Sequence, residues 1–262
     1  MNGRIALVTG AGSGLGAAIA RRLSADGAHL IVNDLDADAA AKVAADVGGE
    51  AAPFDVTDSA AFTAAVDGAV ERHGRIDVLV NNAGIVHDRP DVRERGMANM
   101  AARMEGRDIE PVSATSTLTD DQWDLMIKTH LYGTFYGTRA ALRHMEQVRA
   151  GSIVNLASIY GFIGSPSTPD YAAAKGAIVL FTKSVGREVA PLGIHVNAVA
   201  PGFIDTPLLA PMADMRGMLE VQIPSGRLGE ADEVANLVRF LAGDEASYCF
   251  GDVLTLTGGY SI

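Results

Sequence analysis

Short runs of consecutive apolar residues alternate along the chain with longer, alanine-rich amphipathic stretches. Runs that are apolar throughout, rather than at every second position, are typical of strands covered on both faces of a parallel sheet. The pattern predicts strands at residues 5–8, 30–33, 51–54, 78–80, 153–156, 195–198 and 253–255. It predicts helices near residues 15–25, 37–47, 59–72, 120–145, 171–190 and 231–242.

Strands that alternate with helices form βαβ units, and these units build a doubly wound sheet. The sequence therefore predicts an α/β fold with one Rossmann-type domain over residues 1–262. Its single parallel sheet should contain about seven strands, with helices on both faces. The chain has no internal repeat and no low-complexity linker that would divide it.

The segment 87–117 departs from this alternation. Its 31 residues include two prolines, five arginines, six acidic residues and three methionines. A loop of this length in a compact domain is usually functional or disordered. Met97, Met100 and Met104 fall at helical spacing, so a short helix is plausible within the segment. Because it follows a predicted strand end, we expect it near the substrate cleft, as a substrate lid, a subunit-contact arm or a tolerated surface loop.

The net charge of −11 argues against nucleic acid or an anionic membrane as a partner, because phosphate binding needs a basic surface. No stretch approaches the roughly 20 apolar residues of a membrane span, and no targeting segment is visible. One cysteine, Cys249, excludes an internal disulfide framework, and a small buried hydrophobe is its simplest interpretation. We predict a cytoplasmic protein without a metal site.

A glycine-rich turn follows the first predicted strand and opens the first helix. Gly10, Gly14 and Gly16 are spaced Gly-x-x-x-Gly-x-Gly, with Ser13 and Leu15 between them. Such a turn lets the backbone approach a pyrophosphate, which then lies at the helix N-terminus. Leu15 stands where the commoner dinucleotide fingerprint has its third glycine. In this strand–turn–helix context, the pattern predicts a dinucleotide site.

Asp34 ends the second predicted strand, 18 residues after Gly16. A carboxylate there can accept hydrogen bonds from ribose hydroxyls and would repel a 2′-phosphate. Ser13 and Leu35 supply no cation for that phosphate, so the sequence favours NAD over NADP. A helix cap or turn is the alternative role for Asp34. Asp55–Val56, at the next strand tip, could contact the adenine, although capping by Asp55 or Thr57 is equally open.

Tyr171 and Lys175 lie four residues apart, on one face of a largely apolar helix. A phenol with a pKa near 10 is a poor base at neutral pH. A nearby cation favours the phenolate and makes general acid–base catalysis possible. The simpler interpretation is a tyrosine at a helix start and a lysine that reaches solvent.

Six motifs in this order resemble the short-chain dehydrogenase/reductase family over nearly the whole chain apart from 87–117. They are TGAGSGLG (9–16), DV (55–56), NNAG (81–84), NLAS ending in Ser158, YAAAK (171–175) and NAVAPGFIDT (197–206). The resemblance implies that Tyr171 is the general acid/base and that Lys175 lowers its pKa while holding the nicotinamide ribose. Ser158 would then hydrogen-bond the substrate oxygen.

The same resemblance implies further cofactor contacts. Asn82 would contact the cofactor ribose and support the central sheet, with a purely structural turn as the alternative. The Ile204 backbone and the Thr206 hydroxyl would hold the nicotinamide carboxamide. His130 stands where the family usually has an asparagine that holds a water in a proton relay to the lysine. Histidine can also donate and accept, so the relay could survive with an altered pH response; a histidine merely packed in the helix is the alternative.

The family implies an NAD-dependent oxidoreductase that interconverts a secondary alcohol and a ketone, both small molecules. Tracts similar to HLYGTF (130–135) occur in members acting on 3-hydroxyacyl or 3-oxoacyl thioesters, and cyclic alcohols of steroid or terpene type are the alternative substrates. An inactive nucleotide-binding regulator, or an epimerase or dehydratase that uses bound NAD, is a rival function. Similar members are mostly tetramers, so we expect a homotetramer that pairs residues 120–145, 171–190 and 254–262, aided by small residues such as Ala172–Ala174 and Gly176.

Overall fold

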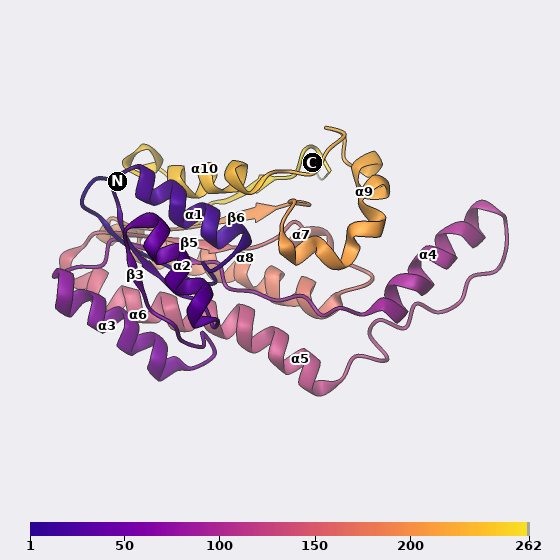
Figure 1. Ribbon diagram of the computed structural model, residues 1–262, viewed down its shortest axis with the longest axis horizontal. Coiled ribbons are helices and arrows are strands. Elements are labelled where there is room, and N and C mark those ends of the chain that lie inside the picture. Colours follow the sequence, from indigo (N-terminus) through magenta and orange to yellow (C-terminus); the bar gives the residue numbers. More distant parts are fainter. Residues whose placement is uncertain (261–262) are drawn as a thin grey trace.

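The computed structural model describes residues 1–260, apart from the side chains of residues 211, 213 and 214. Its centre is one parallel sheet with the order β3-β2-β1-β4-β5-β6-β7 (Figure 1). This arrangement confirms the predicted doubly wound sheet. The strands are β1 (Ile5–Val8), β2 (His29–Val32), β3 (Glu50–Ala51), β4 (Val78–Asn81), β5 (Gly151–Leu156), β6 (Ile194–Pro201) and β7 (Val253–Leu256).

Two layers of helices cover the sheet because successive strand residues point to opposite faces. On one face, Val8, Val80 and Val154 pack against α1, α2 and α10. On the other face, Leu7 and Leu79 pack against α3, α6 and α8. These helices span α1 (Gly14–Ala25), α2 (Ala37–Val47), α3 (Ser59–His73), α6 (Gly133–Val148), α8 (Pro169–Val189) and α10 (Ala231–Ala242).

The predicted helix over residues 120–145 is interrupted. It consists of α5 (Asp120–Ile127), a π-helical turn η1 (Lys128–Tyr132) and then α6. A π turn inserts an extra residue into the helical ladder and is frequent at functional sites. The remaining short elements are α4 (Pro90–Met104), α7 (Tyr160–Ile163), η2 (Ala190–Leu192), η3 (Pro207–Met215), α9 (Arg216–Gln222) and η4 (Asp244–Ala246). Within residues 1–260, no helix is long and apolar enough to cross a membrane.

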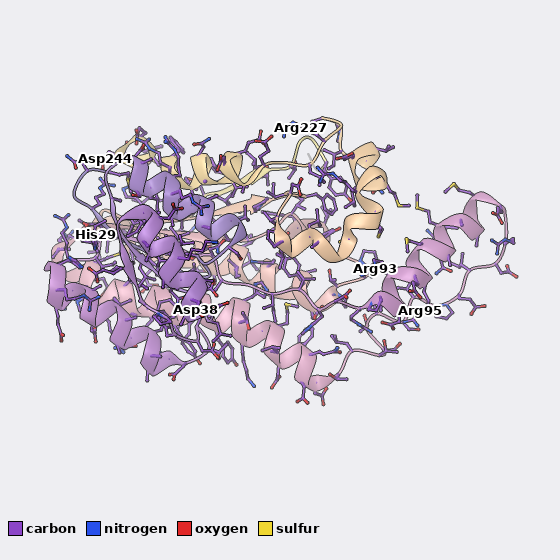
Figure 2. The ribbon with its side chains drawn as sticks, in the orientation of Figure 1. His29, Asp38, Arg93, Arg95, Arg227 and Asp244 are labelled. Atoms are coloured by element: carbon purple, nitrogen blue, oxygen red, sulfur yellow. The ribbon has the colours of Figure 1, made fainter. Side chains whose placement is uncertain are left out.

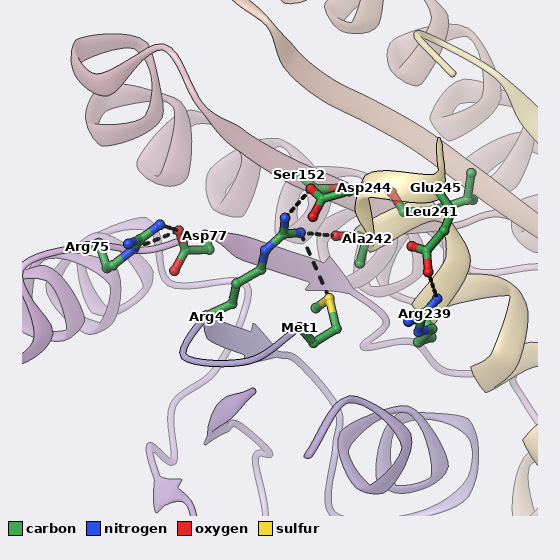
Figure 3. A network of polar contacts seen from close by, with 10 residues as sticks. All are labelled: Met1, Arg4, Arg75, Asp77, Ser152, Arg239, Leu241, Ala242, Asp244 and Glu245. Carbon is green, nitrogen blue, oxygen red and sulfur yellow. Dashed lines mark hydrogen bonds and ion pairs between the residues drawn. The ribbon is translucent and has the colours of Figure 1, made fainter. Parts of the chain in front are cut away.

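At the amino ends of the strands, a polar network fastens the start of the chain to the end of α10 (Figure 3). Arg4 donates to the carbonyl of Ala242 at 2.7 Å and pairs with Asp244. Nearby, Ser152 on β5 donates to the carbonyl of Leu241 at 3.1 Å. The amino ends of the strands are therefore held to the end of α10 by hydrogen bonds and an ion pair.

Segment 87–117 forms an arm that extends from the body of the molecule (Figure 1). It contains the expected helix, α4, followed by a return segment. Asn99 on α4 joins the two, because its amide donates to the carbonyl of Glu110 at 2.6 Å and its oxygen accepts from the amide of Glu110 at 2.9 Å. Arg95 adds a bond to the carbonyl of Val112 at 2.9 Å. Met100 and Met104 remain 41% and 74% exposed.

Three arginines of the arm form ion pairs with acidic residues of the arm itself. Arg93 pairs with Asp88 at 2.8 Å, Arg95 with Asp91 at 2.7 Å, and Arg107 with Glu105 at 2.6 Å. Figure 2 labels Arg93 and Arg95 near the base of α4. These three arginines therefore form a self-paired, solvated face rather than a surface open to an anion.

Candidate active site

Ser158, Tyr171 and Lys175 meet at the carboxyl ends of the central strands, as the motifs predict. Ser158 follows β5, while the other two lie one turn apart at the start of α8. The α7 turn packs very closely on α8: a Cβ on Gly161 would lie 2.8 Å from the backbone carbon of Lys175. Ser158 is buried and hydrogen-bonds the Tyr171 side chain. Lys175 lies beside this pair, with its Nζ atom 5.6 Å from the centroid of the Tyr171 ring.

Burial controls the ionisation of Tyr171 and Lys175. Lys175 is 4% exposed and donates to the carbonyl of Leu156 at 2.5 Å. Loss of solvation lowers the pKa of Lys175 to about 7. It also raises the pKa of Tyr171, and the hydrogen bond from Ser158 opposes this only in part. The resemblance implied that Lys175 lowers the pKa of Tyr171; in the chain by itself, burial raises that pKa and only Ser158 acts against it.

His130 lies beside Tyr171, with the two rings edge to face and their centroids 5.3 Å apart. It belongs to the π turn and is 1% exposed. Its Nε2 atom lies 2.8 Å from the carbonyl oxygen and 3.0 Å from the amide nitrogen of Ile85, whereas its buried Nδ1 atom has no hydrogen-bond partner in the described part of the chain. Gly84 leaves room for the ring, since a Cβ there would lie 2.4 Å from the His130 Cε1 atom.

The ionisation of His130 differs from the expectation of an altered pH response. Burial, with a smaller contribution from Lys175, holds the pKa of His130 well below its usual value. The imidazole is therefore neutral throughout the neutral pH range. A neutral ring with one free nitrogen can still exchange a hydrogen bond with water or ligand, but it adds no titration near pH 7.

Asp170 is a buried polar residue of the site that the motifs did not reveal. It precedes Tyr171, is 3% exposed, and its Oδ2 atom has no hydrogen-bond partner. That oxygen lies 3.6 Å from Nε2 of His87, which itself lies 2.9 Å from the carbonyl of Gln122. The base of the arm therefore reaches a residue adjacent to Tyr171. Only the position of Asp170 beside Tyr171 could have indicated it from sequence.

The glycine-rich turn has the close approaches that its spacing predicted. Gly10 and Gly14 have positive φ angles of 60° and 51°. A Cβ on Gly16 would lie 2.1 Å from the carbonyl oxygen of Gly10, so no larger residue fits without movement. Ser13, the exposed N-cap of α1, makes no side-chain capping bond. The first amide groups of α1 consequently remain available to an anion.

Asn82 braces this turn from the end of β4. Its side-chain amide donates to the carbonyls of Thr9 at 2.9 Å and Gly10 at 3.0 Å. Support of the central sheet comes instead from Asn81, whose amide donates to Asn155 at 2.9 Å. The structural role weighed for Asn82 is therefore present, and its ribose contact stays a prediction.

Asp34 lies against the glycine turn rather than apart from it. Its Oδ2 atom accepts from the amide of Gly12 at 2.9 Å, and its Oδ1 atom accepts from the amide of Asp36 at 3.1 Å. A Cβ on Gly12 would lie 2.8 Å from the Asp34 Oδ2 atom, so Gly12 is a second residue that the motif analysis missed. The hollow beside this turn is also lined by Arg21 and Lys42.

At the next strand tip, Asp55 accepts from the amide of Thr57 at 2.8 Å and forms a turn. The α3 cap is Asp58, which accepts from the amides of Ala60 and Ala61, so neither residue proposed as the cap has that role. Val56 is 7% exposed and packs in the core. Both Asp55 and Val56 remain candidates for the adenine contact.

The loop after β6 closes the other side of the glycine turn. A Cβ on Gly14 would lie 3.8 Å from the Thr206 Cβ atom. Ile204 is 7% exposed and forms an isolated bridge with Gly229, which fixes the loop. The turn after β1, the end of β4 and the loop after β6 therefore enclose one site, although they lie far apart in sequence.

This geometry agrees with the comparisons with known proteins. A family model described as enoyl-(acyl carrier protein) reductase matches residues 10–261. The chain belongs to the short-chain dehydrogenase/reductase family. It is an oxidoreductase of CH–OH and ketone groups, as the resemblance implied.

Individual relatives cover nearly the whole chain. It is 39% identical to 3-oxoacyl-[acyl-carrier-protein] reductase FabG of Salmonella typhimurium, over 98% of this chain and 97% of the relative. It is 38% identical to cis-4-hydroxycyclohexanecarboxylate dehydrogenase of Sinomonas cyclohexanicum, over 98% and 96%. A solved short-chain dehydrogenase/reductase from Brucella melitensis superposes with a TM-score of 0.86 at 30% identity, covering 100% of this chain and 98% of that one.

Proposed function

We propose that this enzyme is an NAD-dependent oxidoreductase that interconverts 3-hydroxyacyl and 3-oxoacyl thioesters. The Ser158–Tyr171–Lys175 group at the strand ends carries this proposal, since it supplies a complete set for alcohol–ketone chemistry. The full-length similarity to a 3-oxoacyl-[acyl-carrier-protein] reductase supports the thioester substrate. An inactive regulator is disfavoured because such a protein would have no need of this intact group.

The residues of the strand ends fit a nicotinamide dinucleotide. Gly10 and Gly16 leave no room for a side chain where the backbone must approach the pyrophosphate. The open amides at the start of α1 would bind the pyrophosphate, Asp34 the adenosine ribose and Asp55–Val56 the adenine. Asn82 and Lys175 would contact the nicotinamide ribose, and Ile204 and Thr206 the carboxamide. When bound, the nicotinamide supplies or accepts the hydride.

The protein's own groups manage the proton and orient the substrate. The Ser158 hydroxyl donates to the substrate oxygen and holds it beside Tyr171. The Tyr171 hydroxyl gives its proton to that oxygen in the reduction and takes it back in the oxidation. Because burial keeps Tyr171 protonated, the cofactor-free site is prepared for the reducing direction. Lys175, with a pKa of about 7, can pick up a proton near neutral pH and then favours the phenolate.

His130 takes the position of the relay residue in this proposal. Its unpartnered Nδ1 atom is the group that would hold a water between the site and Lys175. The ring is neutral, so it passes the proton through hydrogen bonds without being charged itself.

Asp34 underlies the proposed preference for NAD. Its carboxylate is fixed against the glycine turn by the amide of Gly12, where a 2′-phosphate would meet a negative charge. Lys42 and Arg21 line the hollow beside the glycine turn and would attract such a phosphate. Arg21, however, is already paired with Asp46 at 2.8 Å. We therefore infer that the repulsion by Asp34 prevails.

A cyclic alcohol is the second candidate substrate, and the similarity to a cis-4-hydroxycyclohexanecarboxylate dehydrogenase favours it. In either case the arm would act as a substrate lid. His87 at its base lies 3.6 Å from Asp170, beside the general acid, and the α4 methionines form an adaptable apolar face.

We further propose a homotetramer in a cytoplasmic setting. Exposed apolar side chains on the outer faces of α6 and α8 support the assembly, among them Phe135 at 39% and Leu180 at 66% exposure. The small residues expected to aid it act partly within the chain, because Ala174 is fully buried and Gly176 faces Gly161. Residues 261–262 of the expected C-terminal contact lie outside the described residues.

A substrate and cofactor panel tests the proposal. The enzyme is assayed with 3-oxoacyl thioesters, cyclic ketones and simple secondary alcohols, each with NAD(H) and NADP(H). We expect the highest kcat/KM for a 3-oxoacyl thioester and at least about a tenfold preference for NAD(H). Asp34→Ser should narrow that preference, while Asp36→Ser, two residues along, should leave it unchanged. Equal kcat/KM with both cofactors would refute the cofactor proposal. A higher kcat/KM for a cyclic ketone than for a 3-oxoacyl thioester would show that the substrate is a cyclic alcohol or ketone.

A further inference from the structure

Two histidines and a glutamate meet at the edge of the sheet, far along the chain from one another. His29 is the first residue of β2, Glu50 the first of β3, and His73 the last of α3. Nε2 of His29 lies 2.9 Å from Oε1 of Glu50, and Nε2 of His73 lies 2.7 Å from the same oxygen. Within residues 1–260, they form the one group of three potential ligands from His, Cys, Asp and Glu.

We propose that His29, Glu50 and His73 form a binding site for a divalent transition-metal ion such as Zn²⁺. The donor set of two imidazole nitrogens and one carboxylate oxygen is one that Zn²⁺ prefers in sites that keep a fourth position for water. The three ligand atoms all lie within 4.8 Å of one another. Nothing in this inference depends on the proposed substrate or cofactor.

The distances are close to those that a metal ion requires. Zinc binds nitrogen and carboxylate oxygen at about 2.0–2.2 Å, so ligand atoms around a tetrahedral ion lie roughly 3.4 Å apart. The two nitrogen–oxygen gaps of 2.9 and 2.7 Å must therefore widen by about 0.5 and 0.7 Å. Side-chain exposures of 35% for His29, 31% for Glu50 and 21% for His73 leave the rings room to move and an ion a path of entry.

Arg72 prepares the carboxylate for this role. Its Nε atom lies 3.0 Å from Oε2 of Glu50, so the other oxygen, Oε1, faces the two histidines. A partner of this kind orients a ligand without touching the ion. The hydrogen bonds from His29 and His73, together with Arg72, hold the pKa of Glu50 below its ordinary value although burial acts against them.

The site's position indicates what a bound ion would do. β3 is a two-residue strand at the sheet edge, paired through Ile31–Glu50 and Val32–Ala51. An ion would join β2, β3 and the end of α3, and binding to the folded chain alone stabilises it. His29 lies at the amino end of its strand, whereas the active site lies at the carboxyl ends; Figure 2 shows His29 at the far end of the molecule from α4. The ion would stabilise the fold without entering the reaction.

A binding experiment on tag-free, EDTA-treated full-length enzyme tests the site. Zn²⁺ is titrated by calorimetry, and Co²⁺ is used as a spectroscopic probe of the coordination. We expect one ion per chain and a higher unfolding midpoint in urea. His29→Gln and His73→Gln should each weaken binding by at least about tenfold and abolish most of the stabilisation.

His144→Gln is the matched control, because His144 also contacts a carboxylate, Asp67 at 2.6 Å, but has no third ligand. It should retain wild-type binding. Absence of saturable one-to-one binding by the wild-type enzyme would overturn the proposal and leave an ion-paired cluster. Undiminished binding by the folded His29→Gln, His73→Gln double variant would overturn it too, since the ion would then lie elsewhere.

Discussion

The polar groups of the active site and those of the arm differ in burial and in pairing. In the active site, Lys175 is buried with no carboxylate partner among the described side chains, and Asp170 and His130 each have a buried atom without a hydrogen-bond partner there. In the arm, each of three arginines is paired with a nearby acid and the pairs are largely exposed. In the active site, a few buried groups have large electrostatic effects. In the arm, each exposed ion pair contributes little to the free energy of unfolding.

The difference teaches that charge count is a poor guide to chemical importance. The arm contains eleven charged residues, yet exposed pairs of this kind typically contribute about 0–1 kcal/mol each. A single buried lysine shifts its pKa by more than three units, from 10.5 to about 7. Three predictions test this contrast, in order of decreasing expected effect.

The largest effect concerns the stability of cofactor-free enzyme as a function of pH. Because the pKa of Lys175 falls from 10.5 to about 7 on folding, the unfolded chain binds more protons between these pH values. The contribution of Lys175 to the free energy of unfolding therefore rises with pH across this window, by on the order of 4 kcal/mol in total. Lys175→Met should remove this rise in urea titrations from pH 6.5 to 10.

Lys183→Met provides the control for that experiment, since Lys183 lies exposed on the same helix. Its stability should follow the wild-type pH dependence. If Lys175→Met keeps the same rise between pH 7 and 10 as the wild type, the lysine is solvated in solution and the contrast between the two regions disappears.

The next effect concerns the general acid. Tyr171→Phe should lower kcat by roughly 10²-fold or more, because the proton donor beside the substrate oxygen is lost. The dissociation constant for NAD(H), measured by fluorescence, should stay unchanged. Tyr248→Phe changes a tyrosine that is 96% exposed and should retain wild-type kcat. Activity of Tyr171→Phe within a few-fold of the wild type would contradict the catalytic role.

The smallest effect is expected in the arm. Replacement of residues 89–115 by a short glycine–serine link should leave NAD(H) affinity and the unfolding free energy nearly unchanged. It should raise KM for the true substrate or lower kcat by several-fold, because the lid no longer covers the cleft. Arg93→Gln, which breaks only one exposed pair, should alter neither constant. Unchanged KM and kcat in the arm replacement would show that the arm is not a substrate lid.

The sequence predicted the strands and helices well because both faces of the sheet are buried. Continuous apolar runs and amphipathic stretches report that burial directly, and α2 and α10 begin and end at the predicted residues. The edge strand β3 was predicted as residues 51–54 but spans Glu50–Ala51, since an edge strand has pairing on one side only. The helix over residues 120–145 concealed its π turn, because a one-residue widening leaves the apolar spacing almost intact.

The proximity of Tyr171 and Lys175 could be predicted because their spacing of four residues is local. Roles that depend on distant packing could not. His130 contacts Ile85, 45 residues earlier in the chain, and Asp170 faces His87 at the base of the arm. His29, Glu50 and His73 come together only when β2, β3 and α3 pack, so no spacing in the sequence indicates that they are neighbours. The raised pKa of Tyr171 likewise follows from its burial, which the spacing to Lys175 does not reveal.

The π turn at Lys128–Tyr132 has a consequence for the rotational phase of the long helix that contains it. Each residue of an α-helix turns the chain by about 100°. If the same residues continued as a regular α-helix without the wide turn, α5 would be rotated by about that angle relative to α6. Trp123 and Leu125 would then leave their present outer face, and His130 would leave its place beside Tyr171. One extra residue thus sets the orientation of a surface and of a catalytic neighbour together.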